Sequence, residues 1–304
     1  MESEPKGEAW LSFGYGNMFM TKHYLGGGAY PIGDNVESDY GHIRGQSFGL
    51  QVGYGVTDRL ALSFGIPFLS DKYMGEFPHN RAGENGQQFI DDGLYHGTFQ
   101  DYTFNARYRA LNGPISVAPF FSAVIPSHSY TFRAHSAAGL DLQEYLLGFG
   151  LGASLDRVLP GSYIQASYAY AFVERVLGIY HNRSDFAVEL GYSLTESLIL
   201  RWIGTGHYTH GGFDYKDVNA IPREYRPYHD QISRTSAMNL GGGFTYVLTG
   251  STELYATYQR TVMGRGGHKI DQALGFGVTW NFSPKQLFRS YFPSKASPGS
   301  FETP

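Results

Sequence analysis

Apolar and polar residues alternate with a period of two along long stretches of this chain, and this pattern limits the fold more than any other feature. In residues 101–110 one face reads Tyr, Phe, Ala, Tyr, Ala, and the other reads Asp, Thr, Asn, Arg, Arg. Residues 185–194 and 271–282 alternate in the same way. This period is typical of β-strands that have two different environments on their two faces. The pattern therefore predicts an all-β protein built from long strands.

Composition excludes several other classes of protein. Glycine accounts for 40 of the 304 residues, aromatic residues for 16% and charged residues for only 16%, which argues against a disordered chain. The net charge of −4 argues against a nucleic-acid partner. Cysteine is absent, which excludes disulfides, cysteine-based zinc sites and thiol chemistry. No apolar run reaches the roughly 18–20 residues of a membrane-spanning helix.

Short and long connections alternate between the predicted strands. Tight turns are expected near residues 57–59, 112–114, 160–162, 195–197 and 249–251, and longer polar stretches at 25–41, 74–96, 128–141, 177–183, 211–233 and 264–268. Five short and six long connections give about twelve strands, with both chain ends on the short-turn side. This layout predicts a transmembrane antiparallel β-barrel of a bacterial outer membrane, with short periplasmic turns, long extracellular loops, and lipid and lipopolysaccharide around it.

Aromatic residues recur near both ends of the predicted strands. A lower girdle is expected above the short turns and an upper girdle below the long loops. The lower girdle comprises Tyr54, Tyr108, Tyr192 and Tyr246, and the upper girdle Phe68, Tyr73, Tyr130, Tyr180 and Tyr208. The competing interpretation is that these are core residues of a soluble β-domain, but it explains neither the loop asymmetry nor the strand length.

Several motifs resemble the outer-membrane channel family named for the meta-pathway of phenol degradation. They are residues 49–67 (GLQVGYGVTDRLALSFGIP), 101–108 (DYTFNARY), 117–119 (VAP), 125–127 (IPS) and the closing strand 275–282 (GFGVTWNF). The resemblance runs from about residue 8 to residue 282. It implies an outer-membrane channel for hydrophobic or aromatic compounds, and it supplies no catalytic residues.

The strand pattern divides the chain into three parts. Residues 1–7 are expected to form an N-terminal periplasmic extension and residues 8–282 the barrel. Residues 283–304 form a proline-rich C-terminal tail beyond the last aromatic residue of the final strand. The tail is interpreted as a disordered periplasmic extension, with insertion into the lumen or docking of a partner as alternatives.

The inward face of the barrel is where selectivity would be set. The alternation assigns ten polar residues to the pore lining: Asp101, Asn105, Arg107, Arg109, Glu144, Asp185, Glu189, Arg201, Glu253 and Asp271. Among them, Glu189 and Arg201 flank one short turn almost symmetrically, which predicts an ion pair across a hairpin. The competing interpretation is a structural network that fills a narrow barrel.

Three prolines fall within strand-like segments, where each removes a ladder hydrogen bond. Pro67, Pro119 and Pro126 all belong to the third and fifth predicted strands. A weakened ladder there suggests a lateral exit into the membrane for hydrophobic solutes. The alternative is a bulge or a strand end.

No cofactor and no metal site are predicted. All eleven histidines lie on or near the long-loop side, yet no pair has the spacing of metal ligands. No short motif joins a serine to a base, so an enzyme such as a rim hydrolase is not favoured. The sequence favours a channel for a small, apolar or aromatic solute. The alternative is a non-conducting barrel that binds a periplasmic or surface protein through its loops or its tail.

Overall fold

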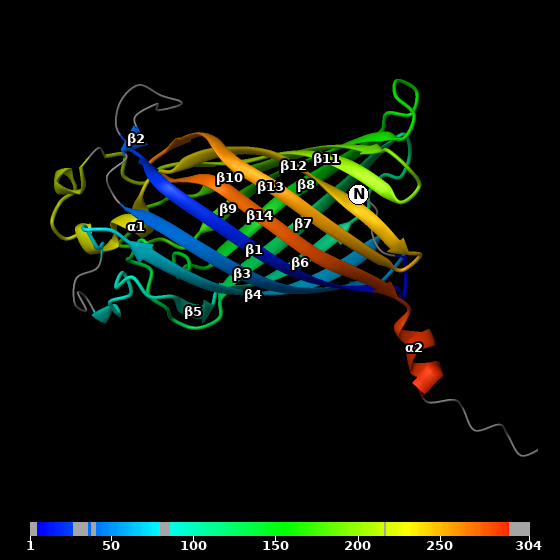
Figure 1. The fold of residues 1–304 in the computed structure, drawn as a ribbon, viewed down its shortest axis with the longest axis horizontal. Coiled ribbons are helices and arrows are strands. Elements are labelled where there is room, and N and C mark those ends of the chain that lie inside the picture. The colour runs from blue at the N-terminus through cyan, green and yellow to red at the C-terminus, as the bar shows by residue number, and fades with distance from the viewer. Residues whose placement is uncertain (1–4, 27–35, 38–40, 80–85, 216, 292–304) are drawn as a thin grey trace, which may run out of the picture.

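Twelve long antiparallel strands form the molecule (Figure 1). The computed structural model describes residues 5–26, 36–37, 41–79, 86–215 and 217–291. The long strands are β1 (Ala9–Tyr24), β3 (His42–Gly55), β4 (Leu60–Met74), β6 (Asp101–Tyr108), β7 (Ile115–Pro126), β8 (Glu144–Ser154), β9 (Ser162–Val173), β10 (Arg183–Ser193), β11 (Leu198–Thr209), β12 (Ser236–Thr249), β13 (Thr252–Arg265) and β14 (Gly267–Phe282).

The strands close into a barrel. Each long strand pairs with the next one along the chain, and β14 pairs with β1, from Ala9 opposite Phe282 to Tyr24 opposite Gly267. Two short strands add to this sheet at the long-loop end: β2 (Val36–Glu37) pairs with β1, and β5 (His96–Phe99) extends the edge of β6 along β4. The predicted twelve-stranded, closed antiparallel barrel is confirmed.

A threonine organises three of the five short turns. The side-chain oxygen of Thr57 accepts hydrogen bonds from the backbone N–H groups of residues 59 and 60. Thr195 does the same for residues 197 and 198, and Thr249 for residue 251. A hydroxyl that satisfies the free backbone donors of a turn stabilises it locally. These turns lie where the sequence predicts them.

Large apolar side chains cover the outside of the barrel. Val188 is 43% exposed, Leu147 56% and Trp202 54%, although each lies in the middle part of a strand. Their neighbours along each strand, such as Glu189, point to the interior. The molecule therefore presents an apolar wall outward and a polar wall inward, the reverse of a soluble β-sandwich.

Three details differ from the sequence predictions. The sixth long connection is reduced to Gly266, whose positive φ of 63° suits glycine. Tyr73 is only 1% exposed and Tyr130 only 7%, so neither belongs to an upper aromatic girdle. Tyr130 lies in the loop after β7 and folds inward, because its hydroxyl donates a hydrogen bond to Asp101.

Both described ends of the chain lie at the short-turn end. The N–H of Gly7 donates to the carbonyl of Gly55, and helix α2 (Pro284–Tyr291) leaves the barrel after β14 (Figure 1). Residues 1–4 of the expected N-terminal extension and 292–304 of the expected tail lie outside the described residues. Within the described ranges, no helix has the length and apolar character needed to cross a membrane.

Candidate functional site in the barrel interior

A hydrogen-bonded ion pair lies in the lumen near the short-turn end. Arg201 Nε lies 3.0 Å from Glu189 Oε2, and Tyr163 donates a 2.7 Å hydrogen bond to Glu189 Oε1. Arg201 is paired in register with Gly191, so the ion pair bridges β10 and β11 diagonally. The two charged side chains are 19–25% exposed, which leaves them in contact with the lumen. The three residues place a fixed, internally neutralised charge pair on the inner wall.

A second charged network lies at the long-loop end of the lumen. Arg183 binds Glu144 in a bidentate fashion, with N···O distances of 3.0 and 2.7 Å, and also contacts Asp185 Oδ1 at 2.7 Å. Two carboxylates around one guanidinium leave a net negative charge here. Glu144 and Asp185 follow the predicted inward face. Arg183 did not follow from the sequence, because it stands at the boundary of an expected loop.

Four other residues of the predicted pore lining bind neighbours on the inner wall. The carboxylate of Asp101 accepts from Tyr130, and that of Asp271 accepts from the side chain of Thr21 at 2.6 Å. The remaining two make interstrand contacts: Asn105 donates to Ser122 at 2.6 Å, and Arg107 stacks over the ring of Phe120. Each of these four residues is thus held by one neighbouring side chain.

The last two predicted residues lie near the short turns. Arg109 follows β6 and its guanidinium donates to the backbone carbonyl of Asp58 in a short turn. Glu253 is the second residue of β13. Both residues therefore lie near the short-turn end of the barrel.

The prolines mark one interruption of the sheet. Pro67 lies in β4, where pairing with β6 ends at Gly65 and pairing with β5 begins at Phe68. Between these ladders, the carbonyl of Pro67 accepts from the N–H of Gln100. Pro119 pairs with Phe149 inside the β7–β8 ladder, whereas Pro126 is the last residue of β7 and pairs with Asp101 at the end of the β6–β7 ladder. The pairing along this edge of β4 is thus interrupted beside Pro67, and a lateral exit there stays a prediction.

Three long loops fold over the outer end of the barrel. They enclose a cavity of about 840 Å³, whose sides are strand residues such as Met20 and Ile43 and whose cover comes from the loops after β4, β7 and β11. The loop after β11 packs Ile232 into a small apolar cluster with Leu142 and Val173. A second cavity, of about 510 Å³, shares lining residues with the first and reaches the Arg183 network.

Asp91 ties two of these loops together. It is only 5% exposed, and its carboxylate accepts hydrogen bonds from the backbone N–H groups of His79, His135 and Ser136 and from the Ser136 hydroxyl. Because a carboxylate that accepts several N–H bonds is strongly stabilised in place, the loop after β4 and the loop after β7 are held as one unit.

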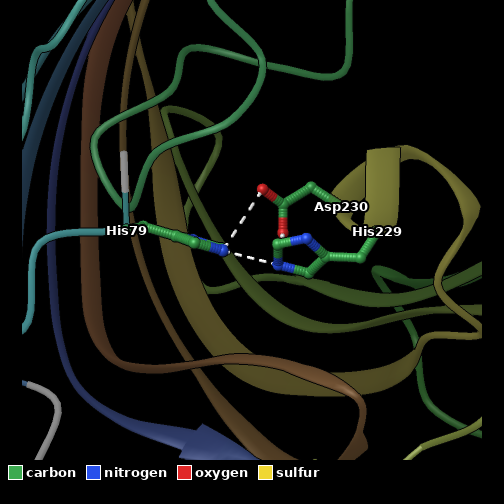
Figure 2. A group of neighbouring side chains, drawn as sticks. All are labelled: His79, His229 and Asp230. Atoms are coloured by element: carbon green, nitrogen blue, oxygen red, sulfur yellow. Dashed lines mark hydrogen bonds and ion pairs between the residues drawn. The ribbon is translucent and has the colours of Figure 1, made fainter. Parts of the chain in front are cut away.

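Histidines from distant parts of the chain meet at the cavity. His79 Nε2 lies 2.5 Å from His229 Nε2 and 3.7 Å from Asp230 Oδ2, and His229 Nε2 lies 3.2 Å from Asp230 Oδ1 (Figure 2). His79 comes from the loop after β4, whereas the other two come from helix α1 (His229–Ile232) in the loop after β11. The separation of 150 residues explains why spacing in the sequence did not reveal this cluster.

Further histidines surround this group. The rings of His79 and His135 lie 4.7 Å apart, and His135 Nδ1 lies 3.3 Å from His268 Nε2. Burial lowers the pKa of His229, and burial together with the nearby His79 lowers that of His135 to about 4. Both imidazoles are therefore neutral at pH 7, so each ring carries one N–H group and one nitrogen lone pair.

Two exposed serine–histidine contacts do not form a catalytic group. Ser127 Oγ lies 2.8 Å from His128 Nδ1, but the other ring nitrogen of His128 faces the hydroxyl of Thr98 and not a carboxylate. Ser184 Oγ lies 2.8 Å from His210 and shares its hydroxyl with Tyr168. Neither contact shows the nucleophile, base and orienting acid that serine hydrolysis needs.

Comparison with solved structures finds the same architecture in outer-membrane channels. The COG4313 outer membrane channel from Pseudomonas putida F1 superposes with a TM-score of 0.67 at 14% identity, over 92% of this chain and 97% of that one. The NanC porin gives a TM-score of 0.51 at 12% identity, over 88% and 98% of the two chains. No family model matches the sequence, and no curated protein matches it.

The apolar outer wall and this shared architecture together show where in the cell the protein lies. The protein is an outer-membrane β-barrel. Barrels that lack free edges are the β-structures that can span lipid, because every strand satisfies its backbone groups within the sheet. The short turns of the barrel then face the periplasm and the long loops the cell exterior. The cavity and its histidines consequently lie at the extracellular mouth.

Proposed function

We propose that the protein is a channel that passes small apolar or aromatic solutes across the outer membrane. The observation that supports this most is the cavity of about 840 Å³ at the extracellular mouth. Its lining includes Phe77, Phe132 and Phe213 beside polar histidines. Small-molecule sites are typically about 300–1,000 Å³, largely apolar, and supplied with a few polar groups that fix orientation. This cavity has the size and the lining of such a site.

A route from the cavity towards the periplasm follows the inner wall. The second cavity shares Leu140 and Thr235 with the first and extends to Arg183 and Asn239. Beyond it, towards the short turns, the wall carries the Glu189 ion pair. The proposed path therefore begins at an apolar binding cavity and continues past polar side chains.

Single-channel recording and solute uptake test this proposal. The refolded protein in a planar bilayer should give steady, salt-dependent current steps. In proteoliposomes, an aromatic solute should enter faster than a sugar of similar size. Phe132→Ser should remove that preference, whereas Leu194→Ser, on the short turn after β10, should not. A barrel that is inserted but silent, with equal and negligible uptake of both solutes, would refute the channel and favour the docking alternative.

A further inference from the structure

We propose that His79, His229 and Asp230 form a binding site for a divalent transition-metal ion, best matched by Zn²⁺, at the extracellular mouth of the barrel. Their ligand atoms, two imidazole nitrogens and one carboxylate oxygen, all lie within 4.8 Å of one another. Zinc in proteins takes this kind of nitrogen and oxygen ligand set. Imidazole ligands favour zinc, copper or nickel over magnesium or calcium, which prefer oxygen.

The orientation of His229 is fixed as a metal ligand requires. Its Nδ1 lies 2.6 Å from the backbone carbonyl of Arg226, and a carbonyl can only accept, so the ring hydrogen sits on Nδ1. The lone pair is then on Nε2, which points towards His79 and Asp230 (Figure 2). Metal-binding histidines almost always donate their other ring N–H in this way.

The Asp230 carboxylate lacks a hydrogen-bond donor for one of its oxygens. Among the described residues, none donates a hydrogen bond to the buried Oδ2, and the nearest ring nitrogen, His79 Nε2, is 3.7 Å away. A buried carboxylate oxygen without a partner is unfavourable. A cation between Asp230 and the two rings supplies the missing partner, so the ligand atoms face a position that attracts positive charge.

The geometry admits an ion after a small rearrangement. Two nitrogens bound to one tetrahedral zinc at roughly 2.0–2.1 Å lie about 3.4 Å apart. The two Nε2 atoms are 2.5 Å apart here, so a rotation that separates them by about 1 Å suffices. Both rings line the large cavity, which provides room for that movement and for a further ligand such as water.

An ion at this position would join two loops across the mouth. His79 belongs to the loop that Asp91 already ties to the loop after β7. On the other side, α1 is tied to the loop after β7 through Gln231, whose side chain donates to the carbonyl of Leu140 at 2.7 Å. A metal bond from His79 to α1 would close this ring of three loops. We infer that the bound ion holds the mouth closed, a consequence that rests on the proposed channel function, whereas metal binding does not.

Calorimetric titration of the detergent-folded, chelator-treated protein with Zn²⁺ tests the binding. One ion per chain is expected, and Co²⁺ should give the visible absorption of a low-symmetry, four-coordinate site. His79→Gln and the isosteric Asp230→Asn should each weaken binding by at least about 100-fold, since loss of a residue that only orients a ligand already costs roughly 10–100-fold. His96→Gln, which changes an exposed histidine bound to Asp92, is the matched control. Absence of binding, or equal binding in all four folded proteins, overturns the site.

Conductance with and without the ion tests the closure of the mouth. Zn²⁺ added on the loop side should reduce the current, and a chelator should restore it, in the unchanged protein and in His96→Gln but not in His79→Gln. If Zn²⁺ binds but does not change the current, the proposed closure of the mouth is wrong and the proposed metal site is unaffected. A protein that binds Zn²⁺ yet never conducts overturns the channel and the closure together.

Discussion

If permeating ions pass the Glu189–Arg201 ion pair, removal of either partner should change the ion selectivity of the channel. Both the direction and the size of that change can be predicted. Arg201→Ala leaves a carboxylate on the lumen wall that retains the hydrogen bond from Tyr163. Glu189→Ala instead leaves an uncompensated guanidinium. Because each variant changes the wall charge by one unit in opposite directions, the first should make the channel more selective for cations and the second for anions.

The magnitude follows from the distance between the wall charge and a passing ion. At about 4–8 Å, a unit charge changes the energy of a monovalent ion by about 0.5–1 kcal/mol in water. A cation and an anion respond with opposite signs, so their energies separate by about 1–2 kcal/mol. At about 1.4 kcal/mol per factor of ten, the ratio of cation to anion permeability changes roughly 5- to 30-fold.

Reversal potentials in a salt gradient measure this ratio, and dilute salt keeps screening small. The double variant, which restores the original net charge, should return close to the unchanged protein. Shifts of the same sign in both single variants, or no shift in either, would show that ions do not pass this pair. Heat-modifiable migration in gels confirms that each variant is folded before recording.

Three further predictions concern the lipid-facing wall of the barrel, the loops that cover its extracellular mouth, and the edge of β4. Val188→Arg should lower the free energy of unfolding by about 2–4 kcal/mol in lipid vesicles, because Val188 faces lipid in the middle of β10. Asp91→Ala should make the loops after β4 and β7 sensitive to added protease and increase the current, because it removes the acceptor that joins them. Pro67→Ala combined with Pro126→Ala should slow uptake of a hydrophobic solute if the break beside β4 is a lateral exit.

Each of these has a matched comparison. Glu196→Arg lies on a short turn outside the lipid, so it should leave the unfolding free energy nearly unchanged; a loss equal to that of Val188→Arg would contradict the membrane placement. Asp92→Ala alters the neighbouring exposed carboxylate and should leave the loops resistant to protease. Uptake that is unaltered by the two proline substitutions would rule out the lateral exit.

The barrel was predictable from the sequence because its determinants are local. A strand reveals its two faces through neighbours two residues apart, and a turn such as Thr57-Asp58-Arg59 reveals itself within three residues. The pairing of Glu189 with Arg201 followed from their symmetry about a single turn. Only its diagonal register needed the structure, because the pattern does not say which residues lie opposite each other.

The arrangement of the loops over the extracellular mouth was not predictable, because their contacts join residues that are far apart in the sequence. His79 and His229 are 150 residues apart, and each lies in an irregular loop without a period to reveal its direction. Tyr130 illustrates the same difficulty. Its place beside a predicted strand end predicts a girdle residue, but a hydrogen bond to Asp101 directs its side chain inward. Loop residues acquire their positions from partners that the sequence does not place beside them.

The pairing of β1 with β14 has a consequence for how the barrel assembles. Ala9 and Phe282 are partners, although 273 residues separate them (282 − 9), whereas every other long strand pairs with its neighbour in the chain. Chain entropy makes closing such a ring about 4 kcal/mol more costly than closing a four-residue hairpin. The hairpins should therefore form first, and the pairing of β1 with β14 should form last. Until β1 and β14 pair, the curved sheet has two unpaired edges. Substitutions in β14 should therefore trap an open intermediate with exposed sheet edges, whereas equivalent substitutions in β8 should not.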